Sequence, residues 1–206
     1  MNELIKKIEE LKNSDIKKEV DRRIRSFNAL NKKSSREWFS ELCFCLLTAN
    51  TSAEMGVRVQ DELGCDGFVC NSEKEMVKRL KKARSRFYNR RGHFIHLANR
   101  YKNIKEILKK QEDKREWLAE NIKGISYKEA SHFLRNVGFF DYAIIDKHIL
   151  RLLHENRLIK KIPDSVNKKN YLEYERILGE LSKKVNLPQG ELDLYLWYTK
   201  TGKILK

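Results

Sequence analysis

The chain has 206 residues, of which 44 are Lys or Arg and 29 are Asp or Glu, giving a formal net charge of +15. So large a positive surplus, with a pI near 9.6, predicts a polyanionic partner, and nucleic acid fits better than a membrane surface. The alternative is the densely charged surface of a thermophilic protein, but such surfaces tend to balance their signs.

Membrane and secretion classes are excluded by the apolar pattern. No apolar run reaches the roughly 18 residues that span a bilayer, and the N-terminus, Met-Asn-Glu-Leu-Ile-Lys-Lys, lacks the apolar core of a signal peptide. We therefore expect a soluble, cytoplasmic protein. Its length allows one large core or two small helical lobes that share a cleft.

Apolar residues recur at helical spacing along nearly the whole chain, and almost no stretch alternates as a strand does. The predicted helices are, in chain order, 4–11, 16–27, 37–48, 87–101, 114–121, 127–137, 147–156, 169–185 and 191–200. Capping boxes at helix starts are predicted for Ser34 with Glu37, Thr51 with Glu54 and Ser72 with Glu75. Pro163 and Pro188 both lie between helical patterns. The predicted fold class is all-α.

The cysteines bear on cofactors. They stand at positions 43, 45, 65 and 70, a spacing too irregular for a zinc ribbon, and none follows residue 70. Reduced thiols that fill the core are the preferred interpretation. We expect no metal and no organic cofactor.

One stretch carries most of the functional information. It runs Ile-Lys-Gly-Ile-Ser-Tyr-Lys-Glu-Ala-Ser-His-Phe-Leu-Arg-Asn-Val-Gly-Phe-Phe-Asp-Tyr-Ala-Ile-Ile-Asp-Lys-His-Ile from residue 122 to residue 149. Gly124 can adopt the positive φ that a tight turn between two helices demands. The backbone N–H groups of such a turn suit a phosphate.

Lys128 and Asp146 are expected to meet. The helix that begins near Tyr127 is about 15 Å long at about 1.5 Å per residue. The apolar run from Phe139 to Ile145, at about 3.3 Å per residue, can return to the start of that helix. Asp146 also stands where the N-cap of the next helix belongs.

The motifs Gly-Ile-Ser-Tyr-Lys-Glu-Ala and Ile-Ile-Asp-Lys-His resemble the helix-hairpin-helix and Gly/Pro-Asp signature of base-excision DNA glycosylases. Within that superfamily, three further segments resemble the compact type 2 8-oxoguanine DNA glycosylases of archaea and some bacteria: Ala-Ser-His-Phe-Leu-Arg-Asn-Val-Gly, Leu-Leu-Thr-Ala-Asn and the C-terminal Leu-Asp-Leu-Tyr-Leu-Trp-Tyr-Thr-Lys-Thr-Gly-Lys-Ile-Leu-Lys. The resemblance covers the chain from about residue 35. Two departures are Ser126, in place of the hairpin's second glycine and therefore expected at positive φ, and the lack of proline between Lys128 and Asp146.

The resemblance implies a two-lobed helix-hairpin-helix glycosylase fold with the active site in the cleft. Residues 1–206 then form one glycosylase unit. One lobe spans about 31–143 and contains the hairpin 122–128, and the other combines about 1–30 with 144–206. The iron-sulfur cluster of some relatives needs four cysteines after the catalytic aspartate, so we expect none here.

The resemblance also implies catalytic roles for two residues. An unprotonated Lys128 amine, favoured by burial near other cations, attacks C1′ of the flipped nucleotide, and the resulting Schiff base permits β-elimination. Asp146, kept ionised by helix N–H groups, stabilises the positive charge that develops on the sugar. One lysine therefore implies both glycosylase and lyase activity.

Base recognition is assigned more broadly. Asn50 aligns with the family's polar plug, which contacts the orphaned partner base, and a simple loop role is the alternative. Phe87 and Trp197 are candidates to sandwich the extruded base, with core packing as the competing interpretation. The terminal carboxylate of Lys206 is expected to take part in base reading. The histidines at positions 132 and 148 are interpreted as packing or phosphate-facing residues, because no zinc-type spacing accompanies them.

The leading hypothesis is a monomeric, prokaryotic, nucleoid-associated enzyme that removes 8-oxoguanine from double-stranded DNA and nicks the strand 3′ to the abasic site. Gly124, Ser126 and Asn50 are its expected DNA-binding residues. A glycosylase for other oxidised bases, such as pyrimidines, is the second enzyme hypothesis. A helix-hairpin-helix DNA-binding module without chemistry is the third hypothesis, and the pairing of Lys128 with Asp146 argues against it.

Overall fold

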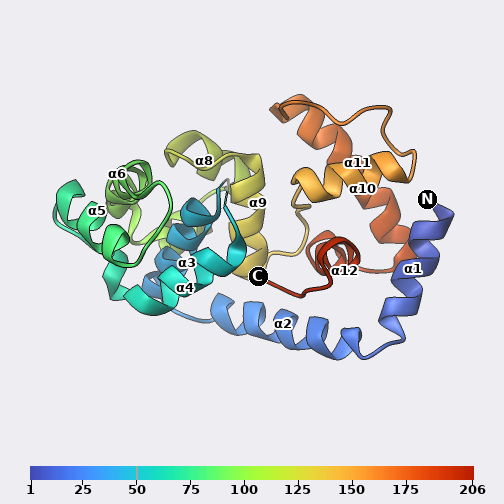
Figure 1. Cartoon of the computed structure of the whole chain (residues 1–206), viewed down its shortest axis with the longest axis horizontal. Helices are drawn as coiled ribbons and strands as arrows, with labels where there is room; N and C mark the ends of the chain where they lie inside the picture. The colour runs from blue at the N-terminus through green and yellow to red at the C-terminus, as the bar shows by residue number, and fades with distance from the viewer. Residues whose placement is uncertain (50) are drawn as a thin grey trace. The chain divides into compact units, whose positions relative to one another are not determined.

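The computed structural model describes residues 1–49 and 51–206, and every regular element in that part of the chain is a helix (Figure 1). The chain divides into two compact units, which we call the terminal unit (residues 1–28 and 138–206) and the central unit (residues 29–137). None of the described helices is both long and apolar enough to cross a membrane.

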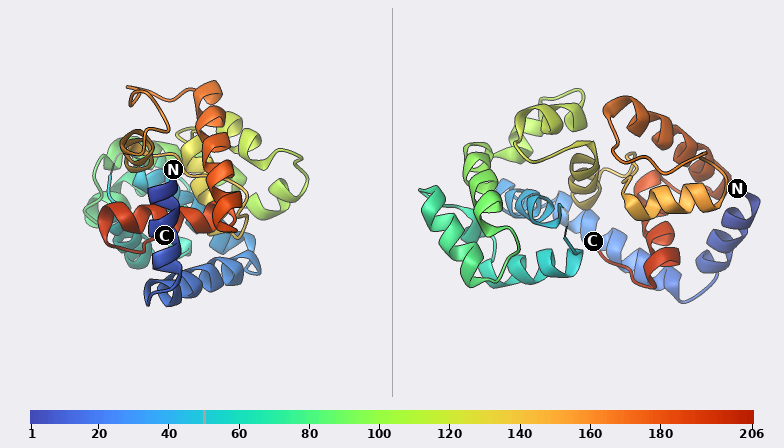
Figure 2. Two further views of the ribbon diagram at one scale, coloured as in Figure 1. Left: turned by 90° about the vertical axis from the view of Figure 1, so that its right-hand side faces the viewer. Right: turned by 45° about the horizontal axis from the view of Figure 1, so that its top comes forward.

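The terminal unit contains helices from both ends of the chain. They are α1 (Asn2–Lys12), α2 (Ile16–Asn31, whose last turn belongs to the central unit), α10 (Lys147–Glu155), α11 (Lys168–Val185) and α12 (Gln189–Thr201). The connection from α10 to α11, residues 156–167, carries no helix (Figure 2). Pro163 lies in that connection and Pro188 is the N-cap of α12, so both prolines fall between helices as the sequence predicts.

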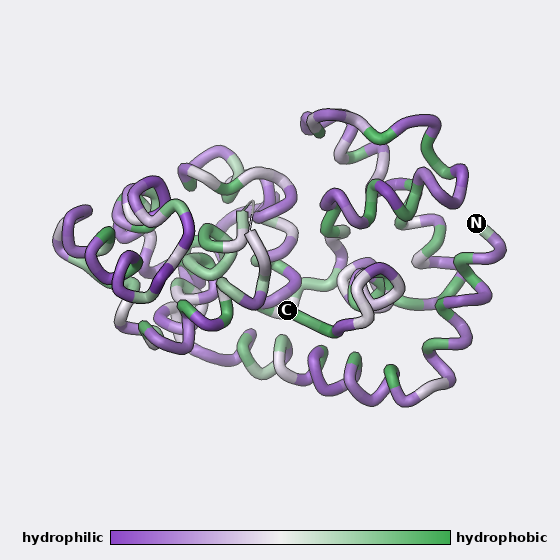
Figure 3. The backbone as a smooth tube through the Cα atoms, in the orientation of Figure 1, coloured by the Kyte–Doolittle hydropathy of each residue, from purple (hydrophilic) through white to green (hydrophobic). Residues whose placement is uncertain are grey.

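The core of the terminal unit is built where α2 meets α12. Apolar residues recur along α2 at the spacing of helical turns, seen as green segments in Figure 3. Val20 and Phe27 pack against Leu194 and Tyr195, all of them at most 2% exposed. Ile204, near the C-terminus, packs on the same cluster. The end of the chain is thereby anchored to this core.

The segment between α9 and α10 belongs to the terminal unit, although the sequence placed the lobe boundary near residue 143. The ring centroids of Phe140 and Phe27 lie 6.5 Å apart. The backbone carbonyl of Phe140 accepts a hydrogen bond of 2.8 Å from the Gly190 N–H. The Ala143 N–H donates to Glu175 of α11 at 3.0 Å. These contacts shift the division to residues 137 and 138.

The central unit contains the remaining helices. They are α3 (Ser35–Thr48), α4 (Ala53–Leu63), η1 (Asp66–Phe68), α5 (Glu73–Lys82), α6 (Tyr88–Ala98), η2 (Asn99–Tyr101), α7 (Ile104–Lys109), α8 (Lys114–Asn121) and α9 (Tyr127–Asn136). α3 is the centre of this unit, because α4, α6, α7 and α9 all pack on it. Every residue of α3 from Trp38 to Thr48 is buried, including the polar Ser40, Glu41 and Thr48, as fits a helix that is surrounded by others. Cys43 and Cys45 fill this core as thiols that are not joined in a disulfide, and burial raises the pKa of the Cys43 thiol well above its usual range.

The predicted helix caps are partly correct. Ser34 forms the expected capping box with Glu37 at the start of α3. The hydroxyl of Ser72 accepts from the Glu75 N–H at 3.2 Å at the start of α5. The prediction for Thr51 is wrong, because the N-cap of α4 is the next residue, Ser52. The Thr51 hydroxyl instead donates to the carbonyl of Leu47 in α3 at 2.8 Å.

Candidate active site

The helical hairpin forms as the sequence predicts, with α8 and α9 packed together in the central unit (Figure 1). The turn between them is closed by a hydrogen bond of 3.1 Å from the Ile125 N–H to the Ile122 carbonyl. Gly124 has φ +92°, and a Cβ there would lie 2.4 Å from Cδ2 of Phe94. Glycine is therefore required both for backbone conformation and for the close approach of α6.

Gly124→Ala is expected to destabilise the fold by about 2–4 kcal/mol, because it combines backbone strain with a clash against an aromatic ring. Denaturant unfolding measures the change. Gly179→Ala is the matched control, since Gly179 lies inside α11 and a Cβ added there would be 3.8 Å from its nearest neighbour, Nε2 of Gln189. That control should stabilise by about 0.5–1 kcal/mol. A Gly124→Ala protein as stable as wild type would contradict the assigned turn.

Ser126 does not adopt the positive φ expected at the hairpin's second glycine position. Its φ is −104° and its ψ −177°, which is extended backbone that any residue adopts. It is the N-cap of α9 and forms a capping box with Glu129. The Ser126 N–H donates to the Glu129 carboxylate at 3.2 Å and so does not point outward to a phosphate. The serine therefore adds no strain to the hairpin.

A pocket of about 640 Å³ borders the hairpin turn. Residues 122–125 form one side of it, and Arg90, Phe94 and Arg100 line it from α6 and η2. In the described part of the chain, the N–H groups of Lys123 and Gly124 have no acceptor. Two unpaired backbone donors beside several cationic side chains suit an anionic group such as phosphate.

Lys128 lies in the first turn of α9, and its side chain is 27% exposed. Its Nζ lies 3.1 Å from Oε1 of Glu129, so the charged group against it is a carboxylate rather than the expected cluster of cations. Neighbouring residues on a helix normally point apart. They meet here because the Glu129 side chain folds back over the first turn toward Ser126.

Glu129 is a functional candidate that the sequence interpretation missed. Burial disfavours its ionised form, but Lys128 and the Ser126 hydroxyl outweigh burial, so the pKa of Glu129 is lowered from 4.5. The buried carboxylate thus stays ionised and holds the lysine. The spacing Ser-Tyr-Lys-Glu, a capping-box pattern at residues 126–129, was the signal that could have identified it.

Asp146 occupies the N-cap of α10, as predicted. Its Oδ1 accepts hydrogen bonds from the N–H groups of His148 at 2.8 Å and Ile149 at 2.9 Å. The chain leading to it is held by α11, because the Tyr171 hydroxyl donates to the Ala143 carbonyl at 2.7 Å and accepts from the Ile145 N–H at 3.2 Å. Two helix N–H groups on one oxygen fix the position of the carboxylate.

Trp197 and His148 stand together in the terminal unit. Their rings meet edge to face with centroids 4.7 Å apart, so His148 is a packing residue as expected. The buried indole N–H of Trp197 has no acceptor among the described residues. Beyond it, Gly202 has φ +67° and ends α12, and the Thr201 hydroxyl donates to the Trp197 carbonyl at 2.9 Å. These contacts turn the tail that leads to Lys206.

Phe87 is 55% exposed in the central unit and has φ +54°. A bulky residue in left-handed backbone is a true outlier.

Asn50 lies outside the described residues, although both of its neighbours are described. His132 packs edge to face on Phe44 with ring centroids 5.6 Å apart. In the described part of the chain no three His, Cys, Asp or Glu residues are grouped so that they could hold a metal.

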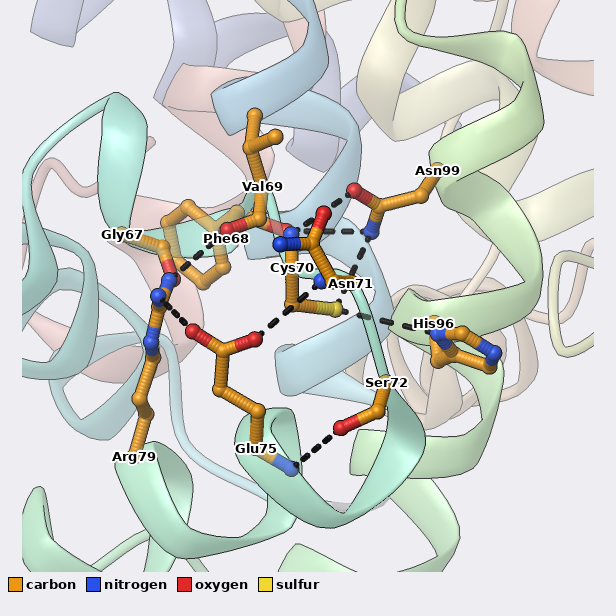
Figure 4. A network of polar contacts seen from close by, with 10 residues as sticks. All are labelled: Gly67, Phe68, Val69, Cys70, Asn71, Ser72, Glu75, Arg79, His96 and Asn99. Atoms are coloured by element: carbon orange, nitrogen blue, oxygen red, sulfur yellow. Dashed lines mark hydrogen bonds and ion pairs between the residues drawn. The ribbon is translucent and has the colours of Figure 1, made fainter.

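Cys70 and His96 form a close thiol–imidazole contact, with Sγ and Nδ1 3.8 Å apart (Figure 4). Asn99 fixes the segment by accepting from the Cys70 N–H at 3.0 Å. Burial, assisted by the nearby Glu75 carboxylate, raises the pKa of the Cys70 thiol. A thiol so disfavoured as thiolate is structural rather than nucleophilic.

The expected site residues are divided between the two units. Lys128 and Phe87 belong to the central unit, whereas Asp146, Trp197 and Lys206 belong to the terminal unit. Within each unit the local arrangement is defined by the contacts above. The meeting of Lys128 with Asp146, and of Phe87 with Trp197, stays a prediction.

A family model described as 8-oxoguanine DNA glycosylase matches residues 20–187. The chain belongs to this family. The 8-oxoguanine DNA glycosylase/AP lyase of Methanocaldococcus jannaschii is 55% identical over 206 residues, covering 98% of this chain and 99% of that protein. The 8-oxoguanine DNA glycosylase/AP lyase of Thermotoga maritima is 42% identical over 210 residues and covers both chains fully.

Solved structures of the glycosylase family agree with the helical fold. The crystal structure of the M. jannaschii 8-oxoguanine glycosylase/lyase in complex with a 15mer DNA containing 8-oxoguanine matches with a TM-score of 0.95 and 55% identity, covering 98% of this chain and 99% of that one. The T. maritima 8-oxoguanine DNA glycosylase matches with a TM-score of 0.91 and 40% identity, covering 100% and 99%. The predicted all-α helix-hairpin-helix glycosylase fold is confirmed.

Proposed function

We propose that this chain removes 8-oxoguanine from double-stranded DNA and then cleaves the strand at the abasic site. The observation that carries the proposal is Lys128, a lysine in the first turn of the helix that follows the hairpin, in a chain of the 8-oxoguanine DNA glycosylase family. A hairpin that served only to grip phosphate would need no amine at this place. The groups that its turn offers to a phosphate are backbone N–H donors.

Lys128 is the nucleophile in this proposal. Its unprotonated Nζ bonds to C1′ of the everted nucleotide, and the bond from C1′ to the base breaks with the electron pair leaving on the base. The nitrogen then loses one proton, the C1′–O4′ bond breaks as O4′ takes up a proton, and a protonated Schiff base between Nζ and C1′ results. That cation makes the C2′ protons acidic, so loss of one proton expels the 3′ phosphate by β-elimination.

Asp146 acts by charge and orientation. Its carboxylate is fixed by two N–H groups of α10 and stabilises the positive charge that develops on the sugar as the base departs. Because the helix end fixes this carboxylate in place, the carboxylate needs no reorganisation during the reaction.

Recognition of the lesion is assigned to groups from both units. Phe87 and Trp197 provide aromatic faces for the everted base, and the terminal carboxylate of Lys206 contributes an acceptor. Oxidation converts N7 of guanine from an acceptor into an N–H donor, so an acceptor in the pocket favours the damaged base. Asn50 contacts the orphaned partner base.

DNA is held largely through phosphates. The pocket beside the hairpin turn, with the free N–H groups of Lys123 and Gly124, takes the backbone of one strand. A chain of net charge +15 draws the duplex to it. We place the enzyme, as a monomer, on the chromosomal DNA of a prokaryotic cell.

The experiment is borohydride trapping of the wild-type protein on a labelled duplex with one 8-oxoguanine opposite cytosine. A covalent protein–DNA adduct is expected on this duplex and not on an undamaged one, because borohydride reduces only the Schiff base. Base release without an adduct would assign the attack to water. A duplex with an oxidised pyrimidine tests the alternative substrate class.

Deleting Lys206 is expected to slow release of 8-oxoguanine while nicking of a ready-made abasic site changes little, since that site has no base to read. Single-turnover assays on the two duplexes measure both rates. Lys206→Ala is the matched control, because it keeps a terminal carboxylate at the same position. Equal rates for the deletion and wild type on both duplexes would remove the C-terminus from base reading.

A further inference from the structure

Arg91 is a buried cation that the assigned chemistry does not use. It lies in α6 and is only 4% exposed. Burial, with the nearby Arg86, lowers its pKa to about 10, so the guanidinium remains charged near neutral pH. Arginine is rarely buried without partners. The hydrogen-bond partners of Arg91 therefore indicate its structural role.

The guanidinium joins two segments far apart in the sequence. Its Nη2 donates to the Ala49 carbonyl at 2.8 Å and to the Thr51 hydroxyl at 2.9 Å, on either side of residue 50. Its Nη1 donates to the Arg86 carbonyl at 2.9 Å, in the turn that carries Phe87. One planar group thus bonds Ala49 and Thr51 as well as the Phe87 turn (residues 84–87).

The Phe87 turn is strained and held in place. Both Arg84 and Phe87 are in left-handed backbone, with φ of +51° and +54°. Arg58 donates to the Ala83 and Arg84 carbonyls at 2.7 and 3.2 Å at the start of the turn. Such strain persists only where surrounding contacts impose it, and it gathers at functional sites.

The strain presents an aromatic ring to solvent. Phe87 is 55% exposed, and the guanidinium carbons of Arg86 and Arg91 lie 5.1 and 5.6 Å from its ring centroid. Packing does not explain a ring held outward in unfavourable backbone. Presentation to a ligand with a planar face does.

We propose that Arg91 is a positioning residue for lesion recognition, which holds Ala49, Thr51 and the Phe87 turn in one geometry so that partner-base reading and stacking on the everted base act together. The proposal rests on the proposed roles of Asn50 and Phe87. Lysine at this place offers one ammonium instead of a planar fork and cannot hold three acceptors in the same plane.

Arg79 offers a matched comparison in the same unit (Figure 4). It also bridges two backbone carbonyls, those of Gly67 and Val69, at 2.7 and 2.8 Å, and it pairs with Glu75. Its acceptors lie around η1 rather than beside residue 50 or Phe87. Replacing Arg79 therefore tests the loss of an arginine that bridges backbone carbonyls, without changing the proposed recognition elements.

The experiment compares Arg91→Lys with Arg79→Lys in single-turnover assays of 8-oxoguanine release, opposite each of the four bases, and of nicking at a ready-made abasic site. Arg91→Lys is expected to slow base release by about 10- to 100-fold, the scale of a misplacement near 1 Å. It should also flatten the preference among partner bases while abasic nicking stays near wild type. Arg79→Lys should leave all three readouts unchanged.

Thr51→Val removes one of the acceptors of Arg91. This second variant keeps the inference testable if Arg91→Lys does not fold. It should shift the same ratio of base release to abasic nicking in the same direction, by a smaller factor. Arg91→Lys and Thr51→Val proteins with the wild-type ratio and partner preference would overturn the inference. Phe87→Ala distinguishes failure of the proposed stacking role from failure of the Arg91 role. Full base release by Phe87→Ala would contradict stacking on Phe87. Slow release by Phe87→Ala, with wild-type behaviour of Arg91→Lys and Thr51→Val, would contradict only the role of Arg91.

Discussion

Lys128→Gln is expected to abolish both base release and borohydride cross-linking, while binding to 8-oxoguanine DNA persists. Glutamine keeps the length and polarity of the side chain but has no amine to attack C1′. The ion pair with Glu129, at 3.1 Å, is lost as well, yet the capping box of Glu129 with Ser126 remains. Single-turnover release, trapping and a binding titration measure the three effects.

Lys123→Gln is the matched control for this experiment. Lys123 is exposed on the hairpin turn, five positions before the proposed nucleophile, and lines the pocket beside it. This variant should weaken binding and lower its salt dependence, by roughly 0.9 log units per log unit of salt if it contacts a phosphate, and keep trapping. Normal trapping by Lys128→Gln would sink the assignment, and loss of trapping by both variants would point to binding instead.

Asp146→Asn is expected to slow base release by about 10²–10³-fold, the scale seen when one group that stabilises transition-state charge is removed. Asparagine caps a helix about as well as aspartate, so the free energy of unfolding should change by less than about 1 kcal/mol. The loss of the negative charge is thereby separated from the loss of the cap. Single-turnover kinetics and denaturant unfolding measure the two quantities.

Asp113→Asn is the control, because Asp113 is the N-cap of α8 and its carboxylate accepts the Glu116 N–H at 2.9 Å. It should show the same small change in stability and unchanged base release. If Asp146→Asn loses activity only in proportion to its folded fraction, its role is confined to the cap.

The sequence by itself determined features set by neighbours in the chain. Helical periodicity located α8, whose bounds, Lys114–Asn121, agree with the prediction. Gly124 was predicted to have positive φ, and it does. Asp146 was expected to cap α10, and its carboxylate accepts two N–H groups there. These features depend on residues within about one helical turn, so local propensity and hydrogen bonding decide them.

The tertiary structure decided features that depend on residues distant in sequence. Residues 138–143 joined the terminal unit because α11 and α12 bind them. Thr51 lost its predicted cap role to Ser52, and its hydroxyl accepts from Arg91, 40 positions away. Among 44 basic residues, nothing in the sequence marked Arg91, because a buried guanidinium is recognised only by the carbonyls folding brings around it. The sequence therefore specified the hairpin and most of the helices, although it gave no range for α4, α5 or α7. Long-range packing decided which charged side chains are buried and what they bind.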